Sequence, residues 1–240
     1  MKHESNPSLK KVDFHSIERN SAAKVEERYN WVCKWKNTDI NFHANCVFLD
    51  KSAFDINMKR SRAWSKKGTR TIVTGPTTRA NTTSILSAIS TVGLITVGVK
   101  KARPAKKRKA DRYISSGTAT GHYIFFLKMT LDEMDKHPHM KGHYLIMDNA
   151  PIHTSNDIAK YVEYRGYRCA YLPPYSPELN PIDQFWSVAK SKIKRQRFLQ
   201  QETLSTRIRE ACNNVKPTDF IGFVTHSHRC LDKCRRKENL

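Results

Sequence analysis

YLIMDNAPIH, residues 144–153, opens with four apolar residues and then places Asp148 before the turn-forming Asn149. A short apolar run that stops at turn residues predicts a buried strand with Asp148 at its end. A second stretch, YLPPYSPELNPIDQFW at residues 171–186, predicts a strand halted by two prolines and then a helix that contains Asp183. Upstream, Asp50 follows the apolar run CVFL at residues 46–49. Two carboxylates at strand ends and a third at a helix start can converge on one edge of a sheet.

The helix that contains Asp183 has a well-specified start. Asn180 is a good N-cap residue, Pro181 suits the first helical position, and Asp183 falls at the third. An acid at this point favours the positive end of the helix, so Asp183 taken alone is also interpreted as a helix-capping carboxylate.

Strands and helices alternate along the rest of the chain. Apolar spacing predicts helices after the N-cap Ser21, over residues 122–135 and 155–165, and from residue 180 onward, with one more helix and a basic tail beyond about residue 203. Predicted strands cover residues 46–49, 70–73, 84–89, 94–99, 144–147 and 168–172. This order predicts an α/β fold with a mixed central sheet flanked by helices.

The chain is strongly basic, with 43 Lys and Arg residues against 22 Asp and Glu residues and a formal net charge of +21. A clustered surplus of this size predicts a polyanionic partner, in the first place DNA or RNA. The chain has no run of 18 apolar residues, so the sequence predicts no membrane span. The N-terminus lacks the apolar core of a signal peptide. Six scattered cysteines fit a reducing compartment better than a disulfide framework.

Asp50, Asp148 and Asp183 are together candidate ligands for divalent metal. Pairs of Mg²⁺ ions in phosphoryl-transfer sites are held by carboxylate oxygens. The alternative is that each Asp is an ordinary strand-end or turn residue. The combination is more specific than any single member, and with the basic charge it predicts chemistry on phosphodiesters.

Residues 144–153 and 171–186 resemble the catalytic core of mariner-superfamily DDE/D transposases. The resemblance extends upstream to VFLD at 47–50 and RAWS at 62–65, and covers roughly residues 25–200. It implies an RNase H-like fold in which Asp50, Asp148 and Asp183 are the catalytic acids and hold two Mg²⁺ or Mn²⁺ ions. It also implies DNA cleavage and strand transfer, usually by a dimer. The thirty-four residues between the second and third acids resemble the mariner branch.

Three departures from the family pattern bear on function. Lys51 follows the first acid where many relatives carry Glu, and many relatives also have Glu as the third acid. Relatives carry paired helix-turn-helix units before the catalytic core, and we expect this chain to lack them. The resemblance implies a transposase catalytic domain acting at transposon ends, and the expected absence of these units bears on how the ends are recognised. The alternative is a truncated or domesticated derivative that binds DNA or a full-length partner without cutting.

The resemblance also suggests a division of the chain. Residues 1–43 are assigned to a polar segment and linker helix, residues 44–205 to the RNase H-like catalytic domain, and residues 206–240 to a C-terminal helix and basic tail. We expect a homodimer or a full-length transposase partner, no membrane association, and a location in the nucleus of a eukaryotic host or otherwise in the cytoplasm.

Residues near the acids have further predicted roles. Asn149 and His153 flank the second acid and are candidates to orient a phosphate or water, although His153 can equally bond neighbouring backbone. Glu178, in the proline-rich loop, is a rival third acid. Two histidines and two cysteines near the C-terminus lack standard zinc spacing and favour scattered positions on a helix: His226, His228, Cys230 and Cys234.

Basic residues in three places are candidates to contact DNA. The first group interleaves with an aromatic residue after the first acid: Arg60, Arg62 and Trp64. The second lies in a predicted loop and is also typical of a nuclear localisation signal: Lys106, Lys107, Arg108 and Lys109. The third, Lys190 and Lys194, follows Asp183 at helical spacing on one face.

Overall fold

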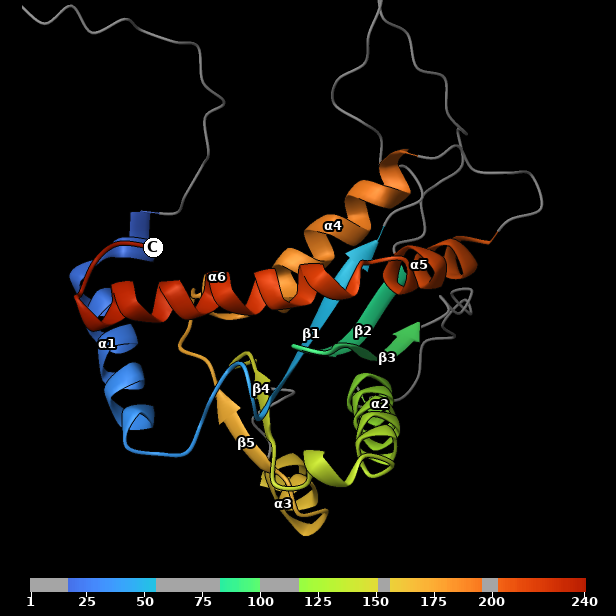
Figure 1. Cartoon of the computed structure of the whole chain (residues 1–240), viewed down its shortest axis with the longest axis horizontal. Helices are drawn as coiled ribbons and strands as arrows, with labels where there is room; N and C mark the ends of the chain where they lie inside the picture. The colour runs from blue at the N-terminus through green and yellow to red at the C-terminus, as the bar shows by residue number, and fades with distance from the viewer. Residues whose placement is uncertain (1–16, 55–82, 100–116, 151–155, 196–202) are drawn as a thin grey trace, which may run out of the picture.

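A five-stranded mixed sheet forms the centre of the protein. The computed structural model describes residues 17–54, 83–99, 117–150, 156–195 and 203–240. Its strands, in the spatial order β3-β2-β1-β4-β5, are β1 (Cys46–Phe54), β2 (Thr83–Ser90), β3 (Gly93–Val99), β4 (Tyr144–Met147) and β5 (Arg168–Tyr171). The first three pair antiparallel, whereas β4 and β5 run parallel to β1. Strand β1 therefore joins an antiparallel half of the sheet to a parallel half (Figure 1).

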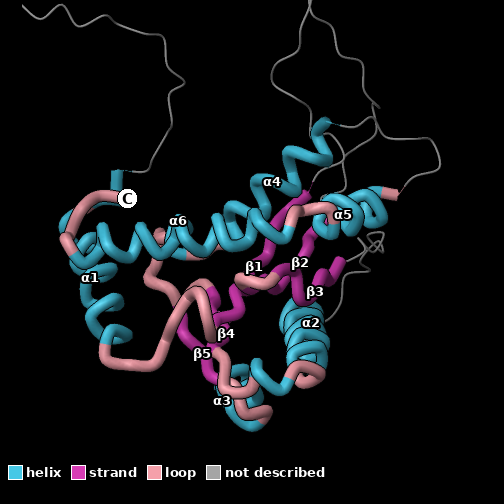
Figure 2. The backbone as a smooth tube through the Cα atoms, viewed as in Figure 1, coloured by secondary structure: helices cyan, strands magenta, loops and turns pink. Residues whose placement is uncertain are grey.

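Helices cover both faces of the sheet. They are α1 (Ala22–Lys36), α2 (Gly117–Met134), α3 (Asn156–Tyr164), α4 (Ile182–Arg195), α5 (Leu204–Asn213) and α6 (Pro217–Arg235), with short 3-10 turns η1 (Ile17–Asn20), η2 (Pro138–Met140) and η3 (Pro177–Leu179). Figure 1 shows α2 and α3 on one side of the sheet and α4, α5 and α6 on the other. Figure 2, coloured by secondary structure, shows the strands between these two groups of helices. The predicted α/β fold with a mixed central sheet is confirmed.

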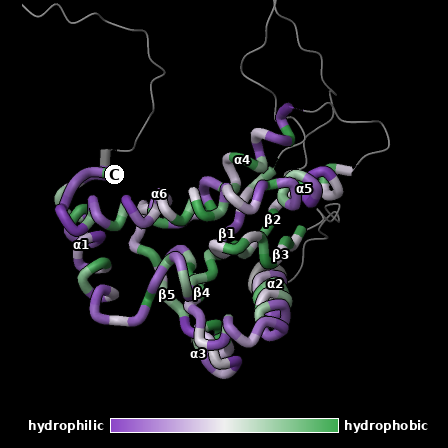
Figure 3. Tube along the Cα trace, viewed as in Figure 1, coloured by the Kyte–Doolittle hydropathy of each residue, from purple (hydrophilic) through white to green (hydrophobic). Residues whose placement is uncertain are grey.

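Alternate residues of β1 belong to two hydrophobic clusters, one on each face of the sheet. Phe48 packs with residues of α1, α4, α5 and α6, whereas Val47 and Leu49 pack with residues of α2 and α3. Successive strand residues point to opposite faces, so a strand buried on both sides is a continuous apolar run. Figure 3 shows this concentration of hydrophobic residues on the strands. Strand β1 is thus a rigid support for Asp50, the residue that follows Leu49.

A buried guanidinium fastens α1 to its surroundings. Arg28 is 1% exposed and donates to the carbonyl oxygen of Arg19 at 2.8 Å and to Oδ1 of Asn20 at 3.0 Å. Asn20 in turn exchanges two hydrogen bonds of 3.2 Å with the backbone of Leu240. As a result, η1, α1 and the residues after α6 meet at one place, beside the C label in Figure 1.

Most predicted elements appear within a few residues of their expected bounds. Ser21 caps α1 by accepting a hydrogen bond from the backbone N–H of Lys24. The buried stripe of α4 is formed by Ile182, Phe185, Trp186, Ala189 and Ile193. The strand predicted at residues 70–73 lies outside the described residues.

Three details differ from the sequence predictions. Strand β1 does not end at Asp50 but continues to Phe54, because it pairs with β2 from Asp50↔Ser87 to Phe54↔Thr83. Helix α4 begins at Ile182, one residue later than expected. The single helix predicted beyond residue 203 is two helices, because Pro217 occupies the first turn of α6, where its missing N–H costs nothing.

Candidate active site

Asp50 and Asp148 lie at matching positions on neighbouring parallel strands. Phe48 of β1 pairs with Ile146 of β4, and each acid follows its paired residue by two positions. Because side chains alternate between faces, Asp50 shares the face of Phe48 and Asp148 shares the face of Ile146. Phe48 and Ile146 both belong to the hydrophobic cluster on the α4 side. The strand register therefore directs both carboxylates toward α4.

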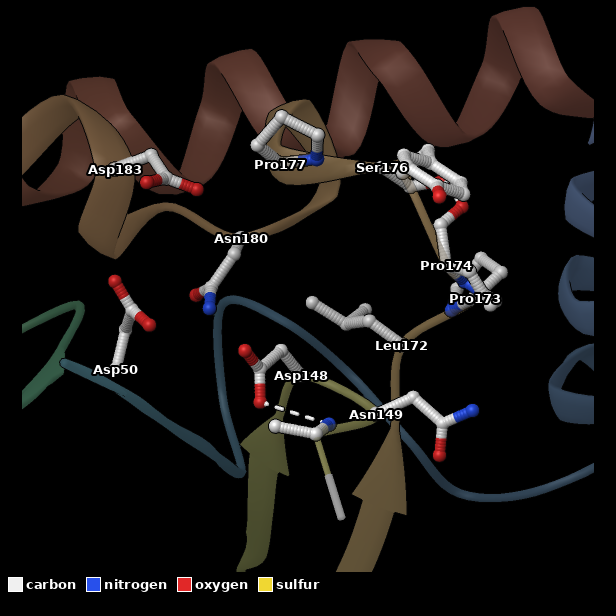
Figure 4. A pocket seen from close by; sticks show the side chains of 12 residues that line it. Asp50, Asp148, Asn149, Leu172, Pro173, Pro174, Ser176, Pro177, Asn180 and Asp183 are labelled. Carbon is white, nitrogen blue, oxygen red and sulfur yellow. Dashed lines mark hydrogen bonds between the residues drawn. The ribbon is translucent and has the colours of Figure 1, made fainter. Parts of the chain in front are cut away.

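Helix α4 supplies the third acid above this edge of the sheet. Its Trp186 is buried and donates a 3.0 Å hydrogen bond from Nε1 to Oδ2 of Asp50. The same indole packs edge-to-face on Phe54, with 5.7 Å between ring centroids. Asp183, in the first turn of α4, faces the space above Asp50 and Asp148 (Figure 4).

The three acids line one open pocket of about 470 Å³. Asn149, Asn180 and the proline-rich loop at 172–177 complete its walls. In Figure 4 the carboxylates point into a common space. Across the described residues, no three His, Cys, Asp or Glu side chains already stand close enough to enclose an ion. The structure brings the predicted ligands to one pocket, and their ligand role stays a prediction.

The charged form of the Asp183 side chain is destabilised by its surroundings. Burial among protein atoms, and then the negative charges of Asp50 and Glu178, raise its pKa to about 7. Asp183 is exposed and lines the pocket, and the protein atoms around it still cost its charged form part of its hydration. Lys190 lowers the pKa and Asp148 adds a further repulsion. Mutually repelling carboxylates of this kind favour the binding of a cation, which removes the repulsion.

The donor set fits a hard divalent cation. Carboxylate oxygens are the ligands that Mg²⁺ and Mn²⁺ prefer. Asp148 accepts a 3.2 Å hydrogen bond from the backbone N–H of Ala150, and Asp50 accepts one from Trp186. Both carboxylates are thus oriented by a neighbouring N–H, as supporting groups orient the ligands of metal sites.

Asn180 connects β1, which carries Asp50, to the start of α4, which carries Asp183. From the sequence, Asn180 was predicted only to cap the helix. The residue is 3% exposed, and its Nδ2 donates at 3.4 Å to the carbonyl oxygen of Leu49, the neighbour of Asp50. Its Oδ1 accepts from the N–H of Ile182 at 3.5 Å, and its backbone carbonyl accepts from Asp183 at 3.1 Å. The side-chain bonds are at the long end of the range, but burial excludes bulk water as a competitor.

We expect Asn180→Ser to lower metal-supported DNA nicking about tenfold, because serine still caps the helix but cannot reach the carbonyl of Leu49. The matched control is Asn45→Ser. Asn45 accepts from the N–H of Asn41 at 2.7 Å and donates to the carbonyl of Asp39 at 2.8 Å, at the other end of β1. Nicking rates over a range of Mg²⁺ concentrations are measured beside thermal unfolding. Equal losses of nicking in both variants would show that Asn180 supports only the fold.

Glu178 does not line the pocket. Its carboxylate forms an ion pair with Arg19 of η1. The sequence left Glu178 as a rival third acid. Because Glu178 pairs with Arg19, Asp183 is the better candidate for the third acid. The negative charge of Glu178 still contributes to the raised pKa of Asp183.

The other predicted site residues fall into two groups. Asn149 is exposed and lines the pocket. Lys190 is half-buried with its Nζ 5.4 Å from the ring centroid of Phe54, and Lys194 is exposed further along α4. The remaining predicted residues lie outside the described part of the chain: His153, Arg60, Arg62, Trp64, Lys106, Lys107, Arg108 and Lys109.

The two histidines and two cysteines of α6 have separate surroundings. Cys230 and Cys234 are buried and His226 is exposed. His228 lies near His43, with 5.5 Å between ring centroids. Within the described residues they belong to no group of three candidate metal ligands.

Comparison with known proteins relates this arrangement to a family. Residues 45–205 match the DDE superfamily endonuclease family. A stretch of 93 residues is 31% identical to the transposable element Tc3 transposase of Caenorhabditis elegans, covering 39% of this chain and 28% of that protein. The chain therefore spans less than a third of the length of this relative.

Solved structures share the fold at low sequence identity. Mos1 transposase in a pre-cleavage transpososome superposes with a TM-score of 0.71 at 16% identity, covering 99% of this chain and 68% of that one. The Mos1 transposase catalytic domain with Raltegravir and Mn superposes with a TM-score of 0.63 at 15% identity, covering 94% of this chain and 98% of that one.

A mixed sheet flanked by helices that matches the Mos1 catalytic domain defines the RNase H-like class of fold, which confirms the fold predicted from the sequence. The chain belongs to the DDE superfamily endonuclease family. The predicted resemblance to mariner-superfamily transposase catalytic domains is also confirmed, by the family match together with the Tc3 and Mos1 similarities.

Proposed function

We propose that this chain is the catalytic domain of a mariner-type DNA transposase, which hydrolyses phosphodiesters at transposon ends and joins the new 3′ hydroxyl to target DNA. The observation that carries the proposal is the matching register of Asp50 and Asp148 beneath Asp183. Further support comes from the family match and from the similar fold of Mos1 transposase structures with Mn or Mg.

Asp50, Asp148 and Asp183 would together hold two Mg²⁺ or Mn²⁺ ions. Such ions supply charge that activates the attacking oxygen and stabilises the leaving 3′ oxygen. Trp186 orients Asp50 through its N–H, and Asn180 keeps the start of α4 beside β1. Lys190 and Lys194 add positive charge along α4, suited to contacts with DNA phosphates.

Nicking of supercoiled plasmid DNA by the purified chain tests the proposal. We expect relaxed plasmid with Mg²⁺ or Mn²⁺ and none with EDTA. Tight DNA binding without nicking under any of these conditions would contradict the proposed chemistry.

A second candidate function is DNA binding without cleavage, by a derivative that holds DNA or a full-length partner. The formal net charge of +21 supports it, because phosphate neutralisation supplies affinity whether or not the three acids are competent. Plasmid nicking separates the two functions, since only the first requires metal-dependent strand breakage.

We further propose that the protein acts as a homodimer or with a full-length transposase. We also propose that it acts where DNA is found, in the nucleus of a eukaryotic host or otherwise in the cytoplasm. Among the described helices, none has the length and apolar character needed to cross a membrane.

DNA affinity is expected to be nearly independent of sequence and to fall about a hundredfold or more between roughly 50 and 200 mM salt. Replacing Lys190 and Lys194 by Gln should weaken binding to all sequences alike and lower the salt slope by about two. Replacing the four basic residues at 106–109 should have a larger effect of the same kind. Anisotropy titrations with two unrelated duplexes measure both properties.

The control for these titrations removes two lysines on the α2 side of the sheet. Lys128 and Lys136 are exposed and pair with nearby acids, so their replacement by Gln should leave the salt slope almost unchanged. Tight, sequence-selective binding by the wild type at physiological salt would contradict the prediction.

A further inference from the structure

Tyr175 has an unusual backbone at the rim of the acid pocket. Its φ of 55° lies in the left-handed region, which among the described non-glycine residues is shared only by Lys237. Bulky residues rarely adopt this region, and such conformations concentrate at ligand sites. The flanking chain holds it in place, because Pro173 is buried and Ser176 donates from its hydroxyl to the carbonyl of Pro174 at 3.1 Å.

This backbone presents the aromatic ring to solvent. Tyr175 is 58% exposed, and within the described part of the chain its hydroxyl has no hydrogen-bond partner. The ring lines the same pocket of about 470 Å³ as Asp50, Asp148 and Asp183. An exposed aromatic face held by a constrained loop is therefore available to anything bound at the acids.

A positive charge accompanies the ring. Lys24 of α1 places its Nζ over one face of the Tyr175 ring, 5.5 Å from the ring centroid, and it also pairs with Glu27 at 2.8 Å. The opposite face of the ring is the one that a base can occupy. An aromatic face beside an ammonium group is the combination by which proteins hold single nucleotides, with the base on the ring and a phosphate near the cation. The ring lines the acid pocket and the lysine lies over the ring, so a base stacked on the ring would bring a neighbouring phosphate near Lys24.

We propose that Tyr175 and Lys24 form a nucleotide subsite, in which a nucleobase unstacked from the DNA next to the reacting phosphodiester stacks on the Tyr175 ring. The proposal rests on the proposed function, because that function brings DNA to the acids. Stacking on an aromatic ring accepts every base. The subsite therefore adds affinity without sequence preference and keeps the strand at the acids separated from its complement.

The test compares two single strands that differ only in their bases. Fluorescence anisotropy is measured with a labelled oligothymidylate of about 12 nucleotides and with an abasic strand of equal length, both without metal. We expect the wild type and Tyr175→Phe to bind the base-containing strand about five- to tenfold more tightly, at the lower end of what one stacked base contributes. Tyr175→Ala should remove this preference while leaving affinity for the abasic strand unchanged.

Two further variants keep the outcome interpretable. Tyr175→Asn also lacks the ring, and asparagine tolerates the left-handed region, so it replaces the alanine variant if that variant does not fold. Tyr164→Ala is the matched control, because Tyr164 of α3 is 88% exposed but does not line the pocket. It should retain the full preference for bases. Lys24→Gln should weaken binding to both strands to a similar extent.

A base preference that survives in both Tyr175→Ala and Tyr175→Asn overturns the subsite. Plasmid nicking with the same proteins separates this result from the proposed function. Metal-dependent nicking by the wild type, together with an unchanged preference in the Tyr175 variants, overturns the subsite alone. Loss of the preference in these variants, without nicking by the wild type, supports the subsite and contradicts the proposed chemistry.

Discussion

Asp148→Ala is expected to abolish plasmid nicking supported by Mg²⁺ or Mn²⁺, lowering the rate by about a thousandfold or more. The variant removes one of the two carboxylates that the strand register sets side by side. Metal-bound charge contributes several kcal/mol to the stabilisation of a phosphoryl-transfer transition state, and each ~1.4 kcal/mol changes the rate about tenfold. Asp148 is exposed and follows the end of β4, so the fold should persist.

The measurement is the nicking rate beside thermal unfolding and DNA affinity. Asp157→Ala is the matched control, because Asp157 is an exposed acid in the first turn of α3 and does not line the pocket. We expect this control to nick at the wild-type rate. Wild-type nicking by Asp148→Ala would refute the three-acid site.

Asp183→Asn is expected to keep the fold and lose metal-dependent nicking, because a neutral amide cannot replace the carboxylate charge at a Mg²⁺ site. A residue that only supported the helix would give the opposite result, with a cost of at most about 1 kcal/mol and full nicking. Asp183→Glu should retain reduced nicking, since it keeps the charge but moves the oxygens in a site with strict octahedral geometry. Full activity of Asp183→Asn would make Glu178 the next candidate for the third acid, despite its pairing with Arg19.

Thermal unfolding in EDTA gives the same variant a second readout. The pKa of the Asp183 carboxyl rises from its ordinary value of 3.8 to about 7 on folding. The folded protein therefore holds this proton more tightly, and wild-type stability should fall as pH rises from about 4 to about 7. Asp183→Asn should lack that part of the decline.

The local pattern of the sequence was sufficient to predict much of the site. The apolar run before Asp148 and the apolar stripe after Asp183 each encode burial directly, so β4 appears where expected and α4 begins within one residue of its expected start. The extension of β1 past Asp50 could not be predicted from the local apolar pattern. It depends on pairing with β2, which is separated from β1 by residues 55–82. Neither partner strand alone shows where that pairing stops.

Long-range side-chain contacts were also inaccessible from the pattern. Asn180 is a good N-cap in any sequence, but its bond to Leu49 spans 131 positions and exists only once β1 and α4 are packed. The ion pair of Glu178 with Arg19 spans 159 positions. The left-handed backbone of Tyr175 had no local signal either, since glycine or asparagine is the residue usually found in that region.

The reciprocal bonds between Asn20 and Leu240 have a consequence for how this unit can be combined with others. Residues more than two hundred positions apart therefore lie side by side, where η1 meets the residues after α6. Chain segments that lie this close together in a domain tolerate fusion and insertion.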